Sequence, residues 1–258
     1  MQTLVLSCNR RSFLLGSGLT AAGLLGSSFG NSARADAAPS SALSGNSIPV
    51  NENPRSCRPQ DPLATLLEGN QRFAKAWKQS NQATTMAARA DAMADLWHRD
   101  CFLSSDVLAT GQAPWAAVLS CADSRVSPEW VFDAAPSDLF VVRSAGNTAF
   151  DDAVASMEFT VSALNTPLIM VMGHSACGAV KAARNEAPLT PLLEQMVTPI
   201  RASLTADDDL EAAVKGNARF AAKQLTKRSQ LLTEAVTKGS LTMVASYFDI
   251  QSGQVTLL

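Results

Sequence analysis

Short apolar runs alternate with segments of helical character along the second half of the chain. Continuous apolar runs occupy residues 115–120, 139–142 and 168–172, and runs of this length suit strands that are buried on both faces of a sheet. Residues 151–164 and 176–185, which follow the second and third runs, have the pattern of helices. Strand and helix therefore alternate, which predicts an α/β fold with a central, mainly parallel sheet flanked by helices.

Helical patterns also flank this alternating core. Apolar side chains recur near helical spacing from Pro62 to Trp77, and Pro62 is well placed for a first helical turn. A second, alanine-rich helix is expected over residues 84–97, so the fold begins with an N-terminal helical arm. The remaining expected elements are helices over 189–204 and 209–238 and a closing hairpin of 241–248 with 254–257.

The first 35 residues have the pattern of an export signal. Arg10 and Arg11 precede a long apolar stretch, and no further charged residue appears before Arg34. The stretch ends on Ala-Arg-Ala at residues 33–35, a small-x-small site that a signal peptidase could cleave before Asp36. The paired arginines before Ser-Phe-Leu resemble a twin-arginine signal.

The alternative for residues 1–35 is a membrane anchor or an N-terminal core helix, because about 20 apolar residues can span a bilayer. Five glycines between residues 16 and 30 weaken such a helix. Residues 36–61, rich in Ser, Pro, Asn and Ala, are expected to be a flexible linker before a folded domain over 62–258. Export predicts a periplasmic protein, or a lumenal one if the source has thylakoids, without a membrane span in its mature form.

Composition restricts the partners and the chemistry. The 258 residues carry a net charge of -2 and no long Lys/Arg run, which argues against nucleic acid because phosphate neutralisation needs a basic face. His98 and His174 are the only two histidines, so a site with several imidazoles is excluded. If Cys8 leaves with the signal and two of the other four cysteines, Cys121 and Cys177, bind a metal, Cys57 and Cys101 remain as a candidate disulfide pair in an oxidising compartment.

Candidate metal ligands follow two of the predicted strands. Cys121 comes directly after the first apolar run, and His174 and Cys177 come directly after the third. The carboxyl ends of parallel strands form a common crevice, so these side chains are expected to converge. Two thiolates and one imidazole suit zinc, and three protein ligands leave a fourth position for water or substrate. The alternative is two buried apolar thiols beside a hydrogen-bonded core histidine.

A carboxylate and a guanidinium accompany the first candidate ligand. Asp123 and Arg125 are two residues apart in an extended or turning segment, so their side chains are expected to share one face. A carboxylate held by a guanidinium fork stays ionised and oriented beside a metal. An ordinary surface ion pair is the alternative.

Three segments make a family resemblance specific. The chain reads C-A-D-S-R-V-S-P-E-W-V-F-D from residue 121, D-L-F-V-V-R-S-A-G-N from residue 138 and G-H-S-A-C-G-A-V from residue 173. In this order they resemble the successive signatures of the β-class carbonic anhydrases, a family of zinc lyases. Similar segments at 66–73, 217–225 and 246–255 extend the resemblance from about residue 62 to the C-terminus.

The resemblance implies the metal, the site and the reaction. It implies a Zn²⁺ cofactor held by Cys121, His174 and Cys177, and a catalytic dyad of Asp123 and Arg125. The implied reaction is reversible hydration of carbon dioxide to bicarbonate and a proton, by attack of zinc-bound hydroxide. A related zinc hydrolase of carbonyl sulfide or carbon disulfide, and a noncatalytic zinc or bicarbonate-binding protein, remain as alternatives.

The resemblance also implies a substrate pocket. Gln112 falls where many plant-like members carry a glutamine that hydrogen-bonds bicarbonate, although a solvent-facing loop glutamine is the alternative. Phe140 and Ala145 are implied to line its apolar side, and Gly146 to permit close approach of the backbone.

Two further properties of the family carry over as expectations. Members form dimers whose interface builds the active sites, so a homodimer or a higher even oligomer is expected. Some members are inhibited by bicarbonate in a side pocket, which contains a tryptophan and a tyrosine. This chain has Val118 and Phe248 at those two positions, and only Arg143 matches the side pocket. We therefore expect the plant-like subtype, with Asp123 paired to Arg125 instead of serving as a fourth zinc ligand in a closed state. Phe159 departs from the tyrosine that plant-like members often carry.

Overall fold

The computed structural model describes residues 53–97, 101–185, 187–206 and 208–258. The predicted signal peptide, most of the predicted linker and His98 lie outside these residues. The described part belongs to one compact unit that runs from Pro49 to Leu258.

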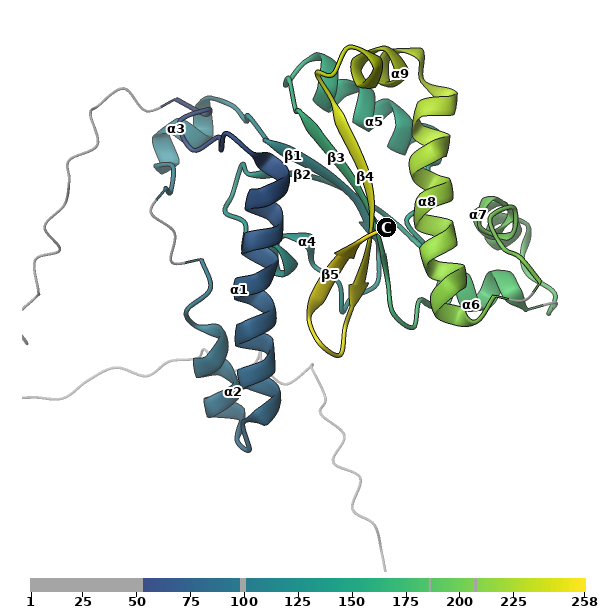
Figure 1. Ribbon diagram of the computed structural model, residues 1–258, viewed down its shortest axis with the longest axis horizontal. Coiled ribbons are helices and arrows are strands. Elements are labelled where there is room, and N and C mark those ends of the chain that lie inside the picture. The colour runs from purple at the N-terminus through teal and green to yellow at the C-terminus, as the bar shows by residue number, and fades with distance from the viewer. Residues whose placement is uncertain (1–52, 98–100, 186, 207) are drawn as a thin grey trace, which may run out of the picture. The chain divides into compact units, whose positions relative to one another are not determined.

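A five-stranded sheet in the order β2-β1-β3-β4-β5 forms the centre of this unit (Figure 1). Its first four strands are mutually parallel and β5 is antiparallel to β4. The sheet confirms the predicted α/β fold, the three apolar strands and the closing hairpin. The strands are β1 Ala116–Cys121, β2 Leu139–Ser144, β3 Leu168–His174, β4 Thr242–Asp249 and β5 Gln254–Leu257.

Helices cover both faces of the sheet (Figure 1). The helices α1 (Pro62–Gln82) and α4 (Pro128–Val131) pack on one face, and α5 (Asp151–Ser162), α8 (Leu210–Arg228) and α9 (Gln230–Thr237) pack on the other. The remaining helices are α2 (Met86–Met93), α3 (Ser105–Thr110), α6 (Gly178–Arg184) and α7 (Pro191–Arg201).

The apolar runs are continuous because both faces of the central strands are buried. Val118 and Met170 lie in the cluster on the α1 side, whereas Leu119 and Val171 lie in the cluster on the α5 and α8 side. All four side chains are fully buried. Successive strand residues point to opposite faces, so a strand covered on both sides needs an apolar residue at every position.

The predicted helix over 209–238 is wrong in one respect, because the segment forms two helices. Ser229 has extended backbone angles of φ -123° and ψ 114° and separates α8 from α9. Its hydroxyl oxygen accepts a hydrogen bond from the Leu232 N–H and caps α9, and its O–H donates to Glu158 at 2.6 Å. Serine offers the backbone this alternative to a continuous helix, which helical periodicity alone does not reveal.

The end of the predicted linker is attached to the domain. Cys57 forms a disulfide with Cys101, with the two Cα atoms 5.6 Å apart. The Arg58 guanidinium donates hydrogen bonds to the carbonyl oxygens of Pro114, Leu164 and Asn165. The fold therefore includes residues 53–61, which the sequence pattern had placed in a flexible linker.

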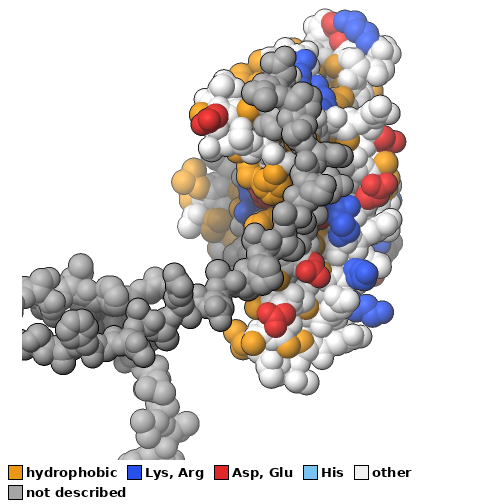
Figure 2. All heavy atoms as spheres, turned by 90° about the vertical axis from the view of Figure 1, so that its left-hand side faces the viewer, with side chains coloured by type: hydrophobic (Ala, Val, Ile, Leu, Met, Phe, Trp, Pro, Cys, Tyr) orange, Lys and Arg blue, Asp and Glu red, His pale blue; other side chains and the backbone are white. Residues whose placement is uncertain are grey.

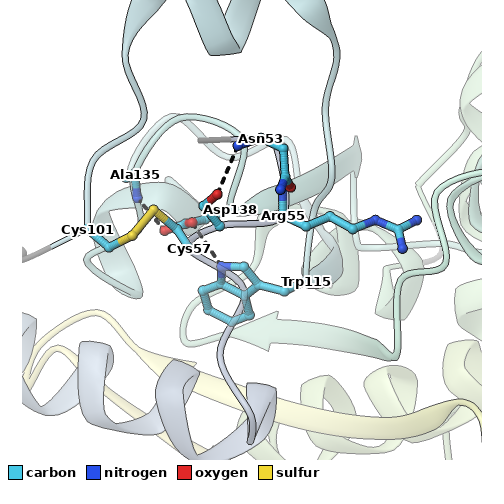
Figure 3. The surroundings of a disulfide bond; sticks show 8 residues. Asn53, Arg55, Cys57, Cys101, Trp115, Ala135 and Asp138 are labelled. Atoms are coloured by element: carbon cyan, nitrogen blue, oxygen red, sulfur yellow. Dashed lines mark hydrogen bonds between the residues drawn. A yellow bond between two sulfur atoms is a disulfide. The ribbon is translucent and has the colours of Figure 1, made fainter. Parts of the chain in front are cut away.

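The disulfide lies beside the start of β1 (Figure 3). The indole N–H of the buried Trp115 donates to Asp138 Oδ1 at 2.9 Å, and the Ala135 N–H donates to Asp138 Oδ2 at 2.9 Å. The covalent link joins the segment before α1 to the segment before α3, near the end of the sheet opposite to the candidate ligands.

Charged side chains of both signs lie on the surface. Acidic and basic side chains are interspersed with hydrophobic ones on the face shown in Figure 2. Within the described ranges, no helix combines the length and the hydropathy that crossing a membrane requires.

Candidate metal centre

The fold brings the three predicted ligands together. Cys121 ends β1, His174 ends the adjacent β3, and Cys177 lies immediately before α6. One ligand atom from each residue lies within 4.8 Å of the other two. All three side chains are buried, and His174 and Cys177 are completely so. The prediction that the carboxyl ends of neighbouring strands gather these residues is confirmed.

The imidazole of His174 is oriented to use one particular nitrogen. Its Nδ1 lies 3.0 Å from the carbonyl oxygen of Ser175, an arrangement that places the ring proton on Nδ1. Its Nε2 is buried and has no hydrogen-bond partner among the described residues. A buried polar nitrogen without a partner is costly, and a metal ion at Nε2 would satisfy it.

The two sulfurs have the separation that one metal ion needs. Cys121 Sγ and Cys177 Sγ are 4.0 Å apart. Two thiolates on a tetrahedral zinc, each at about 2.3 Å, lie about 3.8 Å from one another. The donor set, its burial and the free Nε2 therefore fit zinc with three protein ligands.

The surroundings of Cys121 favour its thiolate form. The neighbouring Cys177 thiol, with the Gly146 N–H, lowers the pKa of Cys121 to about 4. The same pairing and burial raise the pKa of Cys177. The two sulfurs together thus hold one proton firmly, and a cation between them would take the place of that proton.

Asp123 and Arg125 form the predicted pair at the edge of this cluster. Arg125 donates to both carboxylate oxygens, from Nε to Oδ1 at 2.9 Å and from Nη2 to Oδ2 at 2.7 Å. Asp123 Oδ2 is also 3.8 Å from His174 Nε2. The guanidinium of Arg125 holds the pKa of the Asp123 carboxyl well below its usual range. The carboxylate is therefore ionised, oriented and next to the candidate metal position.

Arg143 holds the loop that carries this pair. Its guanidinium donates to the carbonyl oxygens of Cys121, Asp123 and Val126 at 3.1, 2.7 and 2.6 Å. Sequence reasoning noted this arginine only for its likeness to a bicarbonate pocket and missed its contact with the loop backbone. Arg143 lies on β2, opposite Ser120 of β1 in the parallel register. A cationic residue in an otherwise apolar strand beside the one that ends at Cys121 was the signal for this contact.

The turn after β2 contributes two of the predicted pocket residues. Gly146 has φ +75°, and its backbone N–H donates to Cys121 Sγ at 3.3 Å. A side chain at this position would place its Cβ 2.6 Å from Ile200 Cδ1. The backbone at Gly146 thus approaches Cys121 closely, and the half-buried Ala145 lies next to it in the turn. Their assignment as substrate-binding residues stays a prediction.

A single chain does not bring the other two predicted pocket residues to the ligands. Gln112 is exposed and precedes β1, whereas Cys121 ends that strand. Phe140 pairs with Ala117 near the start of β1 and contacts Phe159, with ring centroids 6.2 Å apart. A strand rises about 3.3 Å per residue, so both residues lie near the far end of β1. Their assignment as substrate-binding residues stays a prediction, and it requires them to come from a second subunit.

Comparisons with known proteins agree with the geometry of the site. The model of the family described as carbonic anhydrase matches residues 116–255. Carbonic anhydrase 2 of Mycobacterium tuberculosis is 35% identical over 162 residues, which are 58% of this chain and 77% of that protein.

Two solved structures share the fold. The β-carbonic anhydrase of Coccomyxa in complex with acetazolamide has a TM-score of 0.54 at 26% identity, covering 78% of this chain and 87% of that one. A tetrameric β-carbonic anhydrase of Sordaria macrospora has a TM-score of 0.52 at 25% identity, covering 58% and 83%. Together with the Cys-His-Cys cluster, the family match shows that this chain belongs to the carbonic anhydrases, in their β class.

Proposed function

We propose that the chain hydrates carbon dioxide reversibly to bicarbonate and a proton at a zinc ion held by Cys121, His174 and Cys177. The observation that carries this proposal is the convergence of three buried ligand atoms within 4.8 Å. His174 Nε2 adds to it, because this buried atom has no hydrogen-bond partner in the described chain.

The roles of the protein groups follow from their positions. Zinc, when bound by three protein ligands, makes a water molecule nucleophilic near neutral pH. Asp123 supplies an ionised carboxylate that accepts a hydrogen bond from a proton-bearing nucleophile and fixes its direction. Arg125 orients that carboxylate through two hydrogen bonds, and Arg143 fixes the backbone between Cys121 and Val126.

The finer proposal is an open site in which Asp123 stays on Arg125. In family members that are inhibited by bicarbonate, the side pocket needs an indole N–H and a phenol O–H. Val118 and Phe248 supply neither group. Both side chains are buried in one apolar cluster with α1, where Phe248 contacts Phe73 at 6.2 Å between ring centroids. Without binding differentially to a closed state, bicarbonate cannot shift the protein towards it.

We therefore expect a gradual loss of hydration rate at mildly acidic pH, and bicarbonate acting only as product. A carboxyl whose pKa is depressed in the folded protein keeps its charge as the pH falls to that depressed value. Asp123 thus remains ionised throughout mildly acidic buffers and does not set the acid limb. Initial rates measured against pH and bicarbonate concentration test this expectation. Steep, cooperative inhibition by bicarbonate would contradict the open site and leave zinc catalysis standing.

Self-association is part of the proposal. Strand β2 is an edge strand, yet Leu139, Phe140, Val141 and Val142 on it are apolar and only half-buried. Phe159, on the neighbouring α5, is 49% exposed. Apolar edge strands are normally covered, and a second copy of the chain would cover this one. The proposed state is a homodimer or a higher even oligomer, in which a partner supplies Gln112 and Phe140.

Export to an oxidising compartment completes the proposal. The twin-arginine-like pattern and the site at residues 33–35 support it, and so does the Cys57–Cys101 disulfide, because such bonds persist mainly outside reducing compartments. We expect the mature chain to begin near Asp36 and to contain two titratable thiols, Cys121 and Cys177, once zinc is removed under denaturing conditions. N-terminal sequencing and thiol counting test this. A mature protein that retains Met1, or four free thiols, would refute the respective part.

A further inference from the structure

Helix α8 contacts the strand end that presents His174 and the turn after β2, whose backbone hydrogen-bonds to Cys121. Gly173 directly precedes His174, and a Cβ at Gly173 would lie 2.9 Å from Val214 Cγ1 and 3.2 Å from the Val214 carbonyl oxygen. No side chain fits between β3 and α8 at this point. The helix is therefore seated directly against the strand end that presents His174.

Asn217 lies three residues further along α8 and reaches Gly146, in the turn after β2. Its side chain is 1% exposed, and its Nδ2 donates a hydrogen bond of 2.8 Å to the carbonyl oxygen of Gly146. Its Oδ1 lies 3.4 Å from the Ser203 hydroxyl, whose one proton also has the Ile200 carbonyl oxygen as a closer acceptor at 2.6 Å. The strong contact of the amide is therefore the one to Gly146, and the contact to Ser203 is secondary.

Gly146 passes this constraint to a zinc ligand. Its carbonyl is held by Asn217, and its N–H donates to Cys121 Sγ at 3.3 Å. With φ +75° and no side chain, the residue occupies a backbone region that only glycine enters freely. Its conformation therefore depends on such outside contacts, because no side chain of its own restrains it.

We propose that Asn217 is a positioning residue of the metal centre, which acts through Gly146 to keep a backbone N–H directed at the Cys121 sulfur. The inference rests on the proposed zinc site and adds a residue outside the ligand loops to it. Hydrogen bonds to metal ligands fix their orientation and tune the metal they hold. Loss of the Asn217 amide would free the Gly146 turn, and the N–H···S contact would weaken without any change in the ligands themselves.

The test compares Asn217→Leu with Asn70→Leu in the zinc-loaded protein. Asn70 is a matched control, because it is also buried and also bridges backbone segments, donating to the carbonyl oxygens of Val131 and Gly253. It belongs to α1, and its hydrogen bonds to Val131, Gly253 and Val255 involve neither the ligands nor Gly146. Both substitutions remove a buried amide that joins distant parts of the chain, so both are expected to lower the melting temperature.

The two variants should differ at the metal. We expect Asn217→Leu to release zinc to a chromogenic chelator about 10-fold faster than wild type or more, in line with the cost of losing contacts to metal ligands. In the cobalt-substituted protein its thiolate-to-metal absorption band should shift. Asn70→Leu should keep the wild-type release rate and cobalt spectrum. Ser203→Ala, which removes the hydroxyl near Asn217 Oδ1 together with its hydrogen bond to the Ile200 carbonyl oxygen, should move both readouts in the same direction by less.

Equal release rates and cobalt spectra for Asn217→Leu and Asn70→Leu would overturn the inference, because the effect would then be general loosening. If Asn217→Leu does not fold, the same release rates and cobalt spectra are measured on Asn217→Ala and Ser203→Ala. Wild-type values for both variants would also overturn the inference. A wild-type protein that binds zinc and fails to hydrate carbon dioxide would refute the proposed function instead. The comparison of release rates would still decide the role of Asn217.

Discussion

Replacing Cys177 by serine is expected to remove both the zinc and the hydration activity. A serine hydroxyl is not among the groups that commonly hold zinc in proteins. Cys177 is completely buried beside Cys121, so its loss would leave the ion with two protein ligands. Metal analysis should show about one zinc per wild-type chain and close to none in Cys177→Ser, with stopped-flow hydration at the buffer rate.

The double variant Cys57→Ser/Cys101→Ser is the matched control. It makes the same substitution at the disulfide, which lies at the opposite end of the sheet from the ligands. Loss of a native disulfide commonly costs about 2–5 kcal/mol, so this control is destabilised and should nevertheless keep its zinc. If Cys177→Ser retained full zinc and full activity, the assignment of the ligands would be wrong.

Replacing Asp123 by asparagine is expected to separate metal binding from turnover. The variant should keep about one zinc per chain, because Asp123 is paired with Arg125 and is not one of the three ligands. It should lose at least about 100-fold in kcat, the usual scale for a positioned acid or base group. Hydration rates at saturating carbon dioxide, with zinc measured on the same samples, give both values.

Asp151→Asn is the control for this change. Asp151 also pairs with an arginine, Arg228, but it is almost fully exposed and belongs to α5. Exposed ion pairs contribute little, so Asp151→Asn should match wild type in zinc content and rate. A similar kcat for Asp123→Asn and Asp151→Asn would show that Asp123 and Arg125 form an ordinary surface ion pair without a catalytic role.

The central fold and the ligands could be predicted because they depend on local patterns. Three apolar runs predicted β1, β2 and β3, since strands covered on both faces need apolar residues throughout. Cys121 and His174 directly follow such runs, so a parallel sheet had to bring them to the same edge. Asp123 and Arg125 are close in sequence, and their pairing required only the turn between them.

Other features depend on contacts between distant segments. The contact of Asn217 with Gly146 joins positions 71 residues apart, and no local pattern indicates it. The Cys57–Cys101 bond spans 44 residues, and the distance between the two cysteines depends on how α1 and α2, which lie between them, are folded. Gln112 and Phe140 were predicted from family resemblance alone, and one chain places both away from the ligands. The break at Ser229 depends on a side-chain cap and on Glu158 of another helix.

The most direct test of the account is a zinc titration of the wild-type chain, with the hydration rate measured at each load. Protein stripped of metal by a chelator and checked by metal analysis should hydrate carbon dioxide no faster than buffer. The rate should then rise in proportion to added zinc and stop rising at about one zinc per chain, as one site with three protein ligands requires. Full activity in the verified metal-free protein would contradict the account.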